Sequence, residues 1–267
     1  MSNSVHHQAR KRFGQNFLHD PAIIQRIVDN INPQRQDRII EIGPGKGALT
    51  ELILERVESL DVVEIDRDLV ESLTNSIGKD KSLKIHETDA LKLDLSKFAQ
   101  SDLRIVGNLP YNISTPLLFH LLNYRTCIKD MLFMLQKEVV DRICANPGCK
   151  QYGRLSIMLQ IYCDVESLFI IKPGAFNPSP KVDSAIVKIT PLAKPRYELS
   201  DHESLKVIVR EAFTQRRKTI RNSLKKYISE SDIKEFGIAP EIRAEKLEIS
   251  DFVRLANCYH QLKINSL

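Results

Sequence analysis

The feature that most constrains the fold is a run of glycines directly after a short apolar segment. Residues 38–42 (Arg-Ile-Ile-Glu-Ile) have the length and β-branched content of a buried strand, and the run 43–47 (Gly-Pro-Gly-Lys-Gly) follows at once. Glycines here permit a tight turn and let the backbone approach a bound molecule, while a helix begins beneath them. The pattern predicts a cofactor loop. It is not a phosphate-binding P-loop, because Gly47 follows Lys46 where that motif needs Ser or Thr.

Further apolar segments extend this pattern along the chain. Residues 60–65, 83–86, 103–107 and 131–135 are typical of strands, and residues 165–171 and 185–189 of closing strands. Helical spacing covers residues 21–31, 69–77, 117–122 and 154–160. The entirely apolar segment 131–135 is typical of a strand buried on both faces, as in a parallel sheet. We therefore predict a Rossmann-like α/β fold.

A composition change near residue 194 predicts two domains. At 267 residues, the chain is long enough for one sizeable α/β core and a smaller appendage. The segment 191–195 (Pro-Leu-Ala-Lys-Pro) interrupts the alternation, and apolar residues beyond it follow helical spacing. We expect a catalytic domain over residues 1–194, with an N-terminal arm at 1–18, and an all-helical domain over residues 195–267.

Two acidic residues stand where a nucleoside-containing cofactor would need them. Glu64 ends the strand after the glycine loop, about twenty residues on, where a carboxylate can accept hydrogen bonds from two ribose hydroxyls. Asp89 follows the next strand and can accept the exocyclic amine of an adenine. A solvated acid at a strand end is the alternative for Glu64. With Gly43 and Gly45 in the loop, these residues form the candidate cofactor site, and the loop alone serves NAD, FAD or S-adenosylmethionine equally well.

The run Asn108-Leu109-Pro110-Tyr111 follows the strand 103–107 and is the candidate catalytic corner. The Asn108 side chain offers a carbonyl, and Pro110 fixes φ without an N–H, so that the turn presents acceptors on one side. Tyr111 adds a ring that can stack on a flat base. Acceptors for an exocyclic amine beside such a ring suit a nucleobase turned out of its helix. The alternative is an ordinary strand-to-helix turn.

Two other segments carry aromatic residues in unusual settings. Residues 12–18 (Arg-Phe-Gly-Gln-Asn-Phe-Leu) precede any periodic element, and they either pack on the core or form a flap in which Asn16 and Leu18 close over a ligand. The proline-rich run 172–184 carries Phe176, which is either a second stacking surface or a packing residue.

Positive charge is concentrated in the C-terminal helical region. The formal net charge is +5, and between residues 205 and 227 one side of the helical pattern is basic, with Glu211 as its single acid. Most charged faces are simply solvated. An almost unmixed basic face is instead what a phosphate backbone attracts. The candidate RNA-binding residues are Arg216, Arg217, Lys218 and Arg221.

Cysteine content and hydropathy bear on the compartment. The five cysteines are an odd number with no second pair at zinc-ligand spacing, so we expect free thiols and no metal site. Apolar runs are far too short for a membrane span, and the basic N-terminus has no apolar signal core. We expect a cytoplasmic protein without a membrane partner.

Placed in order, these motifs resemble the ribosomal RNA adenine dimethyltransferase family, and the likeness runs from residue 12 to beyond residue 220. The matching stretches are residues 12–18, 41–50, 63–66, 88–90, 107–112, 176–184 and 213–222. The resemblance implies S-adenosylmethionine as cofactor, held by Asn16, Leu18, Gly43, Glu64, Asp89 and Asn108. It further implies transfer of two methyl groups to N6 of each of two neighbouring adenosines near the 3′ end of small-subunit (16S) rRNA, on the assembling small ribosomal subunit. A monomer is expected.

Other functions share parts of this pattern. Relatives that methylate large-subunit rRNA share the catalytic half, although residues 215–218 (Gln-Arg-Arg-Lys) look like the bacterial small-subunit branch. A nicotinamide or flavin oxidoreductase would share the glycine loop and Glu64 but gives no reason for the Asn108 corner. A non-enzymatic RNA-binding assembly factor would share the basic region.

Overall fold

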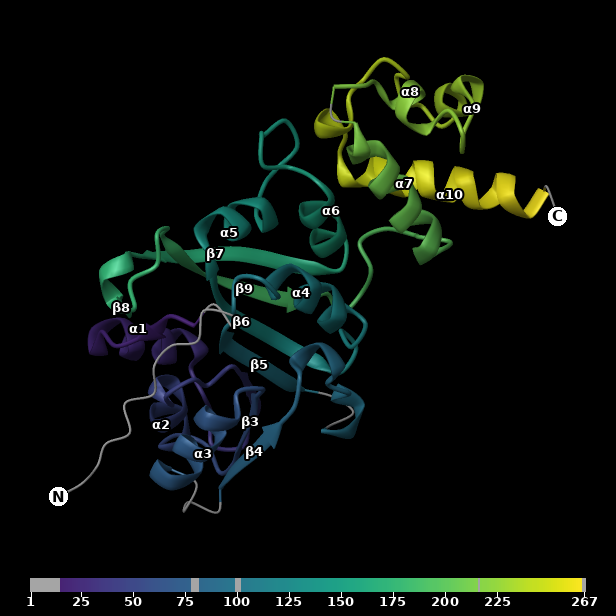
Figure 1. The fold of residues 1–267 in the computed structure, drawn as a ribbon. Helices are drawn as coiled ribbons and strands as arrows, with labels where there is room; N and C mark the ends of the chain where they lie inside the picture. Colours follow the sequence, from purple (N-terminus) through teal and green to yellow (C-terminus); the bar gives the residue numbers. More distant parts are fainter. Residues whose placement is uncertain (1–14, 78–81, 99–101, 216, 266–267) are drawn as a thin grey trace. The chain divides into compact units, whose positions relative to one another are not determined.

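The computed structural model describes residues 15–77, 82–98, 102–215 and 217–265 (Figure 1). The chain divides into two compact units, the first comprising Met1–Val140 and Glu166–Pro191, and the second Asp141–Val165 and Leu192–Leu267. The domain boundary expected near residue 194 stays a prediction. The second unit differs from the expected C-terminal domain because it also takes in residues 141–165.

The first unit is organised around a seven-stranded sheet with the order β4-β3-β2-β5-β6-β9-β7. Strands β4, β3, β2, β5 and β6 are parallel, and β9 is antiparallel to β6. The order reverses between β2 and β5, and in open α/β sheets ligands bind at such a switch point. The strands are β2 (Arg38–Ile42), β3 (Leu60–Glu64), β4 (Leu83–Glu87), β5 (Leu103–Asn108), β6 (Ile128–Gln136), β7 (Cys163–Ile171) and β9 (Ser184–Pro191).

A separate two-stranded ribbon joins β1 (Phe17–Leu18) to β8 (Phe176–Asn177) in antiparallel pairing, with Leu18 opposite Phe176. The α-helices are α1 (Pro21–Ile31), α2 (Ala48–Leu54), α3 (Arg67–Ser76), α4 (Ser114–Leu122), α5 (Lys137–Ile143), α6 (Arg154–Gln160), α7 (His202–Thr214), α8 (Ile220–Leu224), α9 (Glu230–Glu235) and α10 (Ile249–Asn265). Short 3-10 turns are η2 (Ala90–Lys92), η3 (Leu95–Lys97), η4 (Pro173–Ala175) and η5 (Ala244–Lys246). None of the helices in the described part of the chain is long and apolar enough to cross a bilayer.

The sheet is buried on both faces, as the apolar strands predict. Ile39 and Val62 pack in one core with Ile27 of α1 and Ile53 of α2. The neighbouring residue Ile40 is also buried, and successive side chains of a strand point to opposite faces. Both faces therefore need a cover of helices, which is the layered α/β architecture that we predicted.

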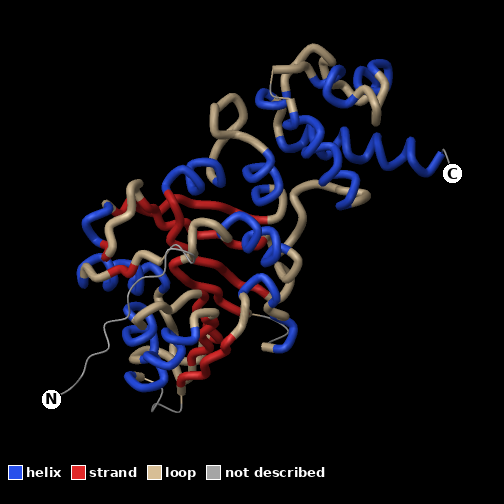
Figure 2. The backbone as a smooth tube through the Cα atoms, viewed as in Figure 1, coloured by secondary structure: helices blue, strands red, loops and turns tan. Residues whose placement is uncertain are grey.

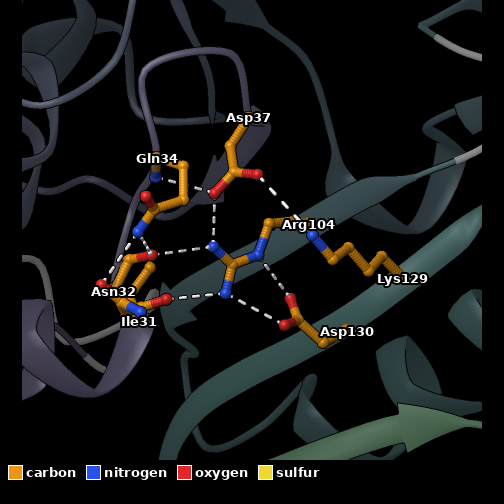
Figure 3. Close-up of polar contacts among 7 residues, drawn as sticks. All are labelled: Ile31, Asn32, Gln34, Asp37, Arg104, Lys129 and Asp130. Carbon is orange, nitrogen blue, oxygen red and sulfur yellow. Dashed lines mark hydrogen bonds and ion pairs between the residues drawn. The ribbon is translucent and has the colours of Figure 1, made fainter.

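A buried arginine ties the amino ends of the strands together (Figure 3). The Arg104 guanidinium on β5 pairs with Asp130 on β6 through bonds of 2.9 and 3.0 Å, and also with Asp37 before β2. It donates further to the backbone carbonyls of Ile31 and Asn32 at the end of α1. This cluster lies at the end of the sheet opposite the glycine loop, because Arg104 is near the start of β5 and Asn108 is at its end.

In the part of the chain from residue 192 onward that the structure describes, the elements are helices joined by loops, with one isolated β-bridge between Thr219 and Arg243 (Figure 2). Its core includes Leu205 and Ile208 of α7, and Phe213 stacks on Phe252 of α10 with ring centroids 5.8 Å apart. Helix α7 ends at Thr214, and α8 begins only at Ile220. The basic stretch around residue 217 therefore lies in the link between two helices, not on one continuous helical face.

Candidate active site

A cavity of about 320 Å³ opens at the carboxyl ends of β2, β3 and β5, next to the switch point. Its walls come from residues 15–17, the glycine loop, the ends of these strands and η2. Among the lining residues are Asn16, Gly43, Gly45, Glu64, Asp89, Asn108, Leu109, Pro110 and Tyr111. Sequence segments about one hundred residues apart thus meet at one cavity, as parallel strands require.

The glycine loop owes its path to backbone conformations that side chains disfavour. Gly43 and Gly45 have φ of +69° and +59°. A Cβ on Gly43 would lie 3.3 Å from the Asn108 carbonyl oxygen, and one on Gly45 would lie 3.3 Å from the Phe17 ring. The loop backbone is therefore in close contact with both the catalytic corner and the N-terminal segment.

Gly107 comes directly before the Asn108 corner, and the sequence analysis assigned it no role of its own. A Cβ at this position would lie 2.2 Å from the Ile42 carbonyl oxygen on the adjacent strand β2. Only glycine allows β5 to approach β2 so closely just before Asn108. The available signal was a glycine inside an apolar strand, which often marks close backbone approach.

Glu64 lies at the end of β3 with only 7% of its surface exposed. One carboxylate oxygen, Oε1, accepts hydrogen bonds of 2.9 Å from the backbone N–H groups of Ile65 and Asp66. Burial raises the pKa of Glu64, and these bonds only partly offset the rise. A buried carboxylate fixed in this way is suited to accept hydroxyl donors from a ligand.

Asp89 lies just after β4, the strand next to β3, and borders the same cavity. Its Oδ1 accepts a 2.9 Å hydrogen bond from the Leu91 N–H and so caps the η2 turn. The Thr88 N–H donates to the Glu64 carbonyl oxygen at 3.0 Å, which joins the two acidic positions through the backbone. Glu64 and Asp89, the two acidic residues that we predicted to bind the cofactor, thus both line the cavity.

A second buried acid, Glu41 on β2, was not singled out from the sequence. It is 1% exposed and accepts a 2.7 Å hydrogen bond from the Thr50 hydroxyl of α2. Burial raises the pKa of Glu41 to about 7. Glu41 borders a smaller recess of about 40 Å³ that also touches Leu18 and Asn108. The Glu41–Thr50 hydrogen bond joins the strand before the glycine loop to the helix after it.

The N-terminal segment from Gln15 to Leu18 lies against the cavity. Gln15 donates to Asp66 at 2.8 Å, and the Asn108 side-chain amide donates to the Asn16 carbonyl oxygen at 3.2 Å. The Lys46 ammonium lies over the Phe17 ring, 4.8 Å from its centroid. Asn16 thus lines the cavity, whereas Leu18 packs in the core, and closure of this segment over a ligand stays a prediction. The arm up to residue 14 lies outside the described residues.

The Asn108 corner is held by backbone and side-chain bonds. The Leu109 N–H donates to the Met134 carbonyl oxygen of β6 at 3.2 Å, and the Leu109 side chain is buried. The Tyr111 hydroxyl is 2.9 Å from the Ser184 Oγ. Burial raises the pKa of Tyr111, and the Ser184 hydrogen bond lowers it by less. The phenol therefore stays protonated at neutral pH.

Phe176 and Leu18 lie beside the cavity rather than on its walls. Phe176 is only 3% exposed and packs with Leu18 in the hydrophobic core, where the two residues are opposite each other in the β1–β8 ribbon. Neither residue is among those that line the main cavity. In this arrangement Phe176 anchors the N-terminal segment, and its proposed stacking on a base stays a prediction.

The predicted RNA-binding residues belong to the second unit. Arg217 and Lys218 are exposed and form no ion pair with the described residues. Arg221 is partly neutralised by Glu230 at 3.5 Å and Glu241 at 3.8 Å. Arg216 lies outside the described residues. Among the predicted RNA-binding residues that the structure describes, Arg217 and Lys218 are therefore less neutralised than Arg221.

Comparison with known proteins identifies the family. The model of the ribosomal RNA adenine dimethylase family matches residues 6–261 of this chain. The chain belongs to that family. This confirms the resemblance drawn from the motifs and makes the protein a methyltransferase, which excludes the oxidoreductase interpretation.

Individual relatives of the adenine dimethylase are similar over nearly their whole length. The ribosomal RNA small subunit methyltransferase A of Pseudomonas aeruginosa is 53% identical over 267 residues, covering 99% of this chain and 100% of that protein. The protein of the same name from a Marinomonas species is 53% identical over 259 residues, covering 96% and 97% of the two chains.

Solved structures share the fold of this dimethylase. A dimethyladenosine transferase from Plasmodium falciparum has a TM-score of 0.75 and 28% identity, covering 94% of this chain and 98% of that one. The 23S rRNA methyltransferase ErmE has a TM-score of 0.70 and 26% identity, covering 92% and 100%. These neighbours confirm the Rossmann-like fold predicted from the strand pattern and the methyltransferase class that the family resemblance implied.

Proposed function

We propose that this protein transfers methyl groups from S-adenosylmethionine to N6 of two adjacent adenosines near the 3′ end of small-subunit rRNA. The product is N6,N6-dimethyladenosine, made during assembly of the small ribosomal subunit. The observation that carries this proposal is one cavity that joins the glycine loop, Glu64 and Asp89 to the Asn108 corner, in a member of the adenine dimethylase family.

The residues around the cavity fit S-adenosylmethionine. Glycines with positive φ leave the loop backbone open to the ligand, and Glu64 offers a buried carboxylate for the two ribose hydroxyls. Asp89 is placed to accept an adenine amine, and the Asn16 segment covers the loop. When bound, this cofactor supplies a methyl group that its positively charged sulfonium has already activated.

The Asn108 corner would hold the target adenine. The amide orientation that donates Nδ2 to the Asn16 carbonyl oxygen leaves Oδ1 as an acceptor, and the Leu109 carbonyl is a second one. Adenine N6 is a weak nucleophile because its lone pair is delocalised into the ring. Two acceptors that hold the N6 hydrogens favour a more tetrahedral, reactive nitrogen, and they fix its direction of approach.

Tyr111 would stack on the flipped base and compensate for the stacking that the base loses on leaving its helix. No side-chain base is needed at the corner, because the N6 proton becomes acidic once the nitrogen is cationic. The corner indeed contains no carboxylate between Asn108 and Tyr111. Positioning is therefore the main contribution of these residues.

We assign rRNA binding to the second unit, with Arg217 and Lys218 as its principal phosphate contacts. These side chains are exposed and lack acidic partners among the described residues. Together with Arg221, they give the region the positive charge that attracts a phosphate backbone.

The deciding experiment uses radiolabelled S-adenosylmethionine and small-subunit particles that lack the modification. After incubation, nucleoside analysis should show labelled N6,N6-dimethyladenosine. Large-subunit particles serve as the matched control, and labelling of those particles alone would move the proposal to the other branch. Binding to small-subunit particles without any methyl incorporation would contradict the proposed methylation of this substrate.

A further inference from the structure

A buried serine holds the far end of the Tyr111 side chain. Ser184 is 0% exposed, and its Oγ lies 2.9 Å from the Tyr111 hydroxyl. The two residues are 73 positions apart in sequence. Ser184 is the first residue of β9 and pairs with Gln136 of β6. Nothing in the proposed chemistry so far uses this contact.

The position of the two residues in the sheet explains what the bond does. Tyr111 follows β5, while Ser184 begins β9, and β6 lies between these two strands. Two strand spacings amount to about 9.5 Å. The tyrosine side chain must therefore extend across the carboxyl end of β6 for its hydroxyl to reach Ser184.

The backbone of Tyr111 is also held in place. The Ser114 hydroxyl donates to the Tyr111 carbonyl oxygen at 3.1 Å, and Pro110 restricts the preceding backbone. With the backbone held at one end and the hydroxyl at the other, the long axis of the ring, from Cβ to Oη, has a fixed direction. The ring therefore occupies its place across the end of β6 before any base arrives.

Ser184 is in turn anchored by its neighbour. The Asp183 carbonyl oxygen accepts a 2.9 Å hydrogen bond from the Lys137 N–H, and the Asp183 carboxylate pairs with Lys172 at 2.7 Å. The serine thus occupies a fixed point at the end of the 172–184 segment.

We propose that Ser184 is a positioning residue for methyl transfer, which holds the Tyr111 ring in the orientation needed to stack on the target adenine. This inference rests on the proposed function, since it presumes that Tyr111 receives the base. Because the Tyr111 ring is already held in place, binding of the base does not cost the entropy of ordering this side chain. Loss of the Ser184 hydrogen bond should reduce the rate at which the bound base reaches the reactive geometry.

The test is a double-mutant cycle of Ser184→Ala, Tyr111→Phe and the double variant, assayed on unmodified small-subunit particles. Each single variant should lower kcat about 3- to 10-fold, the range expected for one hydrogen bond. The double variant should lose no more than either single one, because both remove the same bond. The dissociation constant for S-adenosylmethionine should not change in any variant.

Ala185→Gly is the matched control for general loosening of β9, because Ala185 is the buried neighbour of Ser184. Its kcat should stay near that of the parent protein even if its Tm falls. The inference is overturned if the two single losses multiply in the double variant, if cofactor affinity falls instead, or if Ser184→Ala has full activity. If the parent protein methylates no particle, the proposed function fails, which is a distinct result.

Discussion

The side-chain amide of Asn108 donates a hydrogen bond to the backbone carbonyl oxygen of Asn16 over 3.2 Å. These two residues are 92 positions apart, and both line the cavity. The bond uses the donor side of the amide, so that the acceptor side is left for the substrate amine that we propose. The segment 15–18 and the Asn108 corner are therefore joined at this cavity.

Replacing Asn108 tests the proposed chemistry directly. We expect Asn108→Ala to lower single-turnover methylation about 100- to 1000-fold, by analogy with losing one positioned polar group at a reacting centre. Asn123→Ala is the control, since Asn123 is an exposed amide at the end of α4 in the same unit. Near-normal turnover of Asn108→Ala would remove this side chain from the reaction.

Glu64 should make cofactor affinity depend on pH. Burial raises the pKa of Glu64, so the carboxylate becomes protonated at a higher pH than an ordinary glutamate as the solution is acidified. Since the charged form is the better acceptor of ribose hydroxyls, affinity for S-adenosylmethionine should fall as the pH drops through this raised pKa. Calorimetric titration at several pH values would measure the effect.

The Glu64→Gln variant identifies the group responsible. It should weaken cofactor binding by about 1.5–3 kcal/mol, or about 10- to 100-fold, the usual value of a hydrogen bond to a charged group. It should also flatten the pH dependence. Glu87→Gln is the control, because Glu87 ends the adjacent strand β4 but pairs with Arg67. A pH dependence that survives in Glu64→Gln would point to another group.

Gly107 offers a test of the close strand approach. Gly107→Ala would place a Cβ 2.2 Å from the Ile42 carbonyl oxygen, and β2 and β5 would have to separate. We expect the free energy of unfolding to fall by about 3 kcal/mol, which is the upper part of the range for overpacked interiors and can be measured by urea unfolding. Gly174→Ala is the matched control, since nothing lies within 4 Å of a Cβ there. Equal stability of the two variants would contradict this role.

Arg104 should be essential for stability but not for chemistry. Arg104→Ala removes the buried guanidinium from the partly buried carboxylates of Asp37 and Asp130, although Asp37 keeps Lys129 at 3.8 Å. The free energy of unfolding should fall by about 3 kcal/mol at neutral pH, the lower part of the range for breaking a buried ion pair. Arg35→Ala is the control, because the Arg35–Glu58 ion pair is exposed. The free energy of unfolding of this variant should stay close to that of the parent protein. Similar losses in the two variants would mean that the buried cluster contributes no more than a surface pair.

The same cluster has a predictable response to acid. Burial would raise the pKa of Asp37, but hydrogen bonds from Gln34 and Arg104 outweigh it, and the net pKa is lowered. A carboxylate with a lowered pKa stabilises the fold above its unfolded-state pKa, and this contribution disappears as the pH falls through the folded-state value. The stability gap between the parent protein and Arg104→Ala should therefore narrow in acid, as urea unfolding at pH 7 and pH 3 would show.

Charge reversal at the link before α8 tests the assignment of rRNA binding. Arg217→Glu and Lys218→Glu should weaken binding to small-subunit particles. The slope of log K against log salt concentration should become shallower by about 0.7–0.9 for each phosphate contact that is lost. Arg35→Glu, on the first unit, serves as control. A fall in cofactor affinity instead would contradict the division of roles between the two units.

Local pattern predicted the elements well where one physical factor dominates. The helix over 21–31 and the strand over 38–42 have the expected bounds, because periodicity and the following glycine leave one solution. The strand expected over 131–135 extends in the structure to Ile128–Gln136, since charged residues at its start meet partners that the sequence does not reveal. The site residues Gly43, Glu64, Asp89 and Asn108 meet because the ends of parallel strands meet.

Other features depend on contacts between distant residues, and the sequence could not reveal them. The burial of Phe176 follows from its pairing with Leu18 in the β1–β8 ribbon, which has no local signal. The bond between Tyr111 and Ser184 requires the strand order β5-β6-β9. The break between Thr214 and Ile220 arises partly because Ile220 donates to the Ile242 carbonyl oxygen instead of continuing the helix.

The β1–β8 ribbon has a mechanical consequence for the pocket. Leu18 and His19 are joined by backbone pairing to Phe176 and Ala175, and the chain continues from there to Ser184. A displacement of the 172–184 segment would therefore be transmitted through this pairing to Leu18 and His19. Because Asn16 lies two residues before Leu18 and its carbonyl oxygen accepts from Asn108, the geometry at the end of β5 depends on a ribbon that lies outside the main sheet.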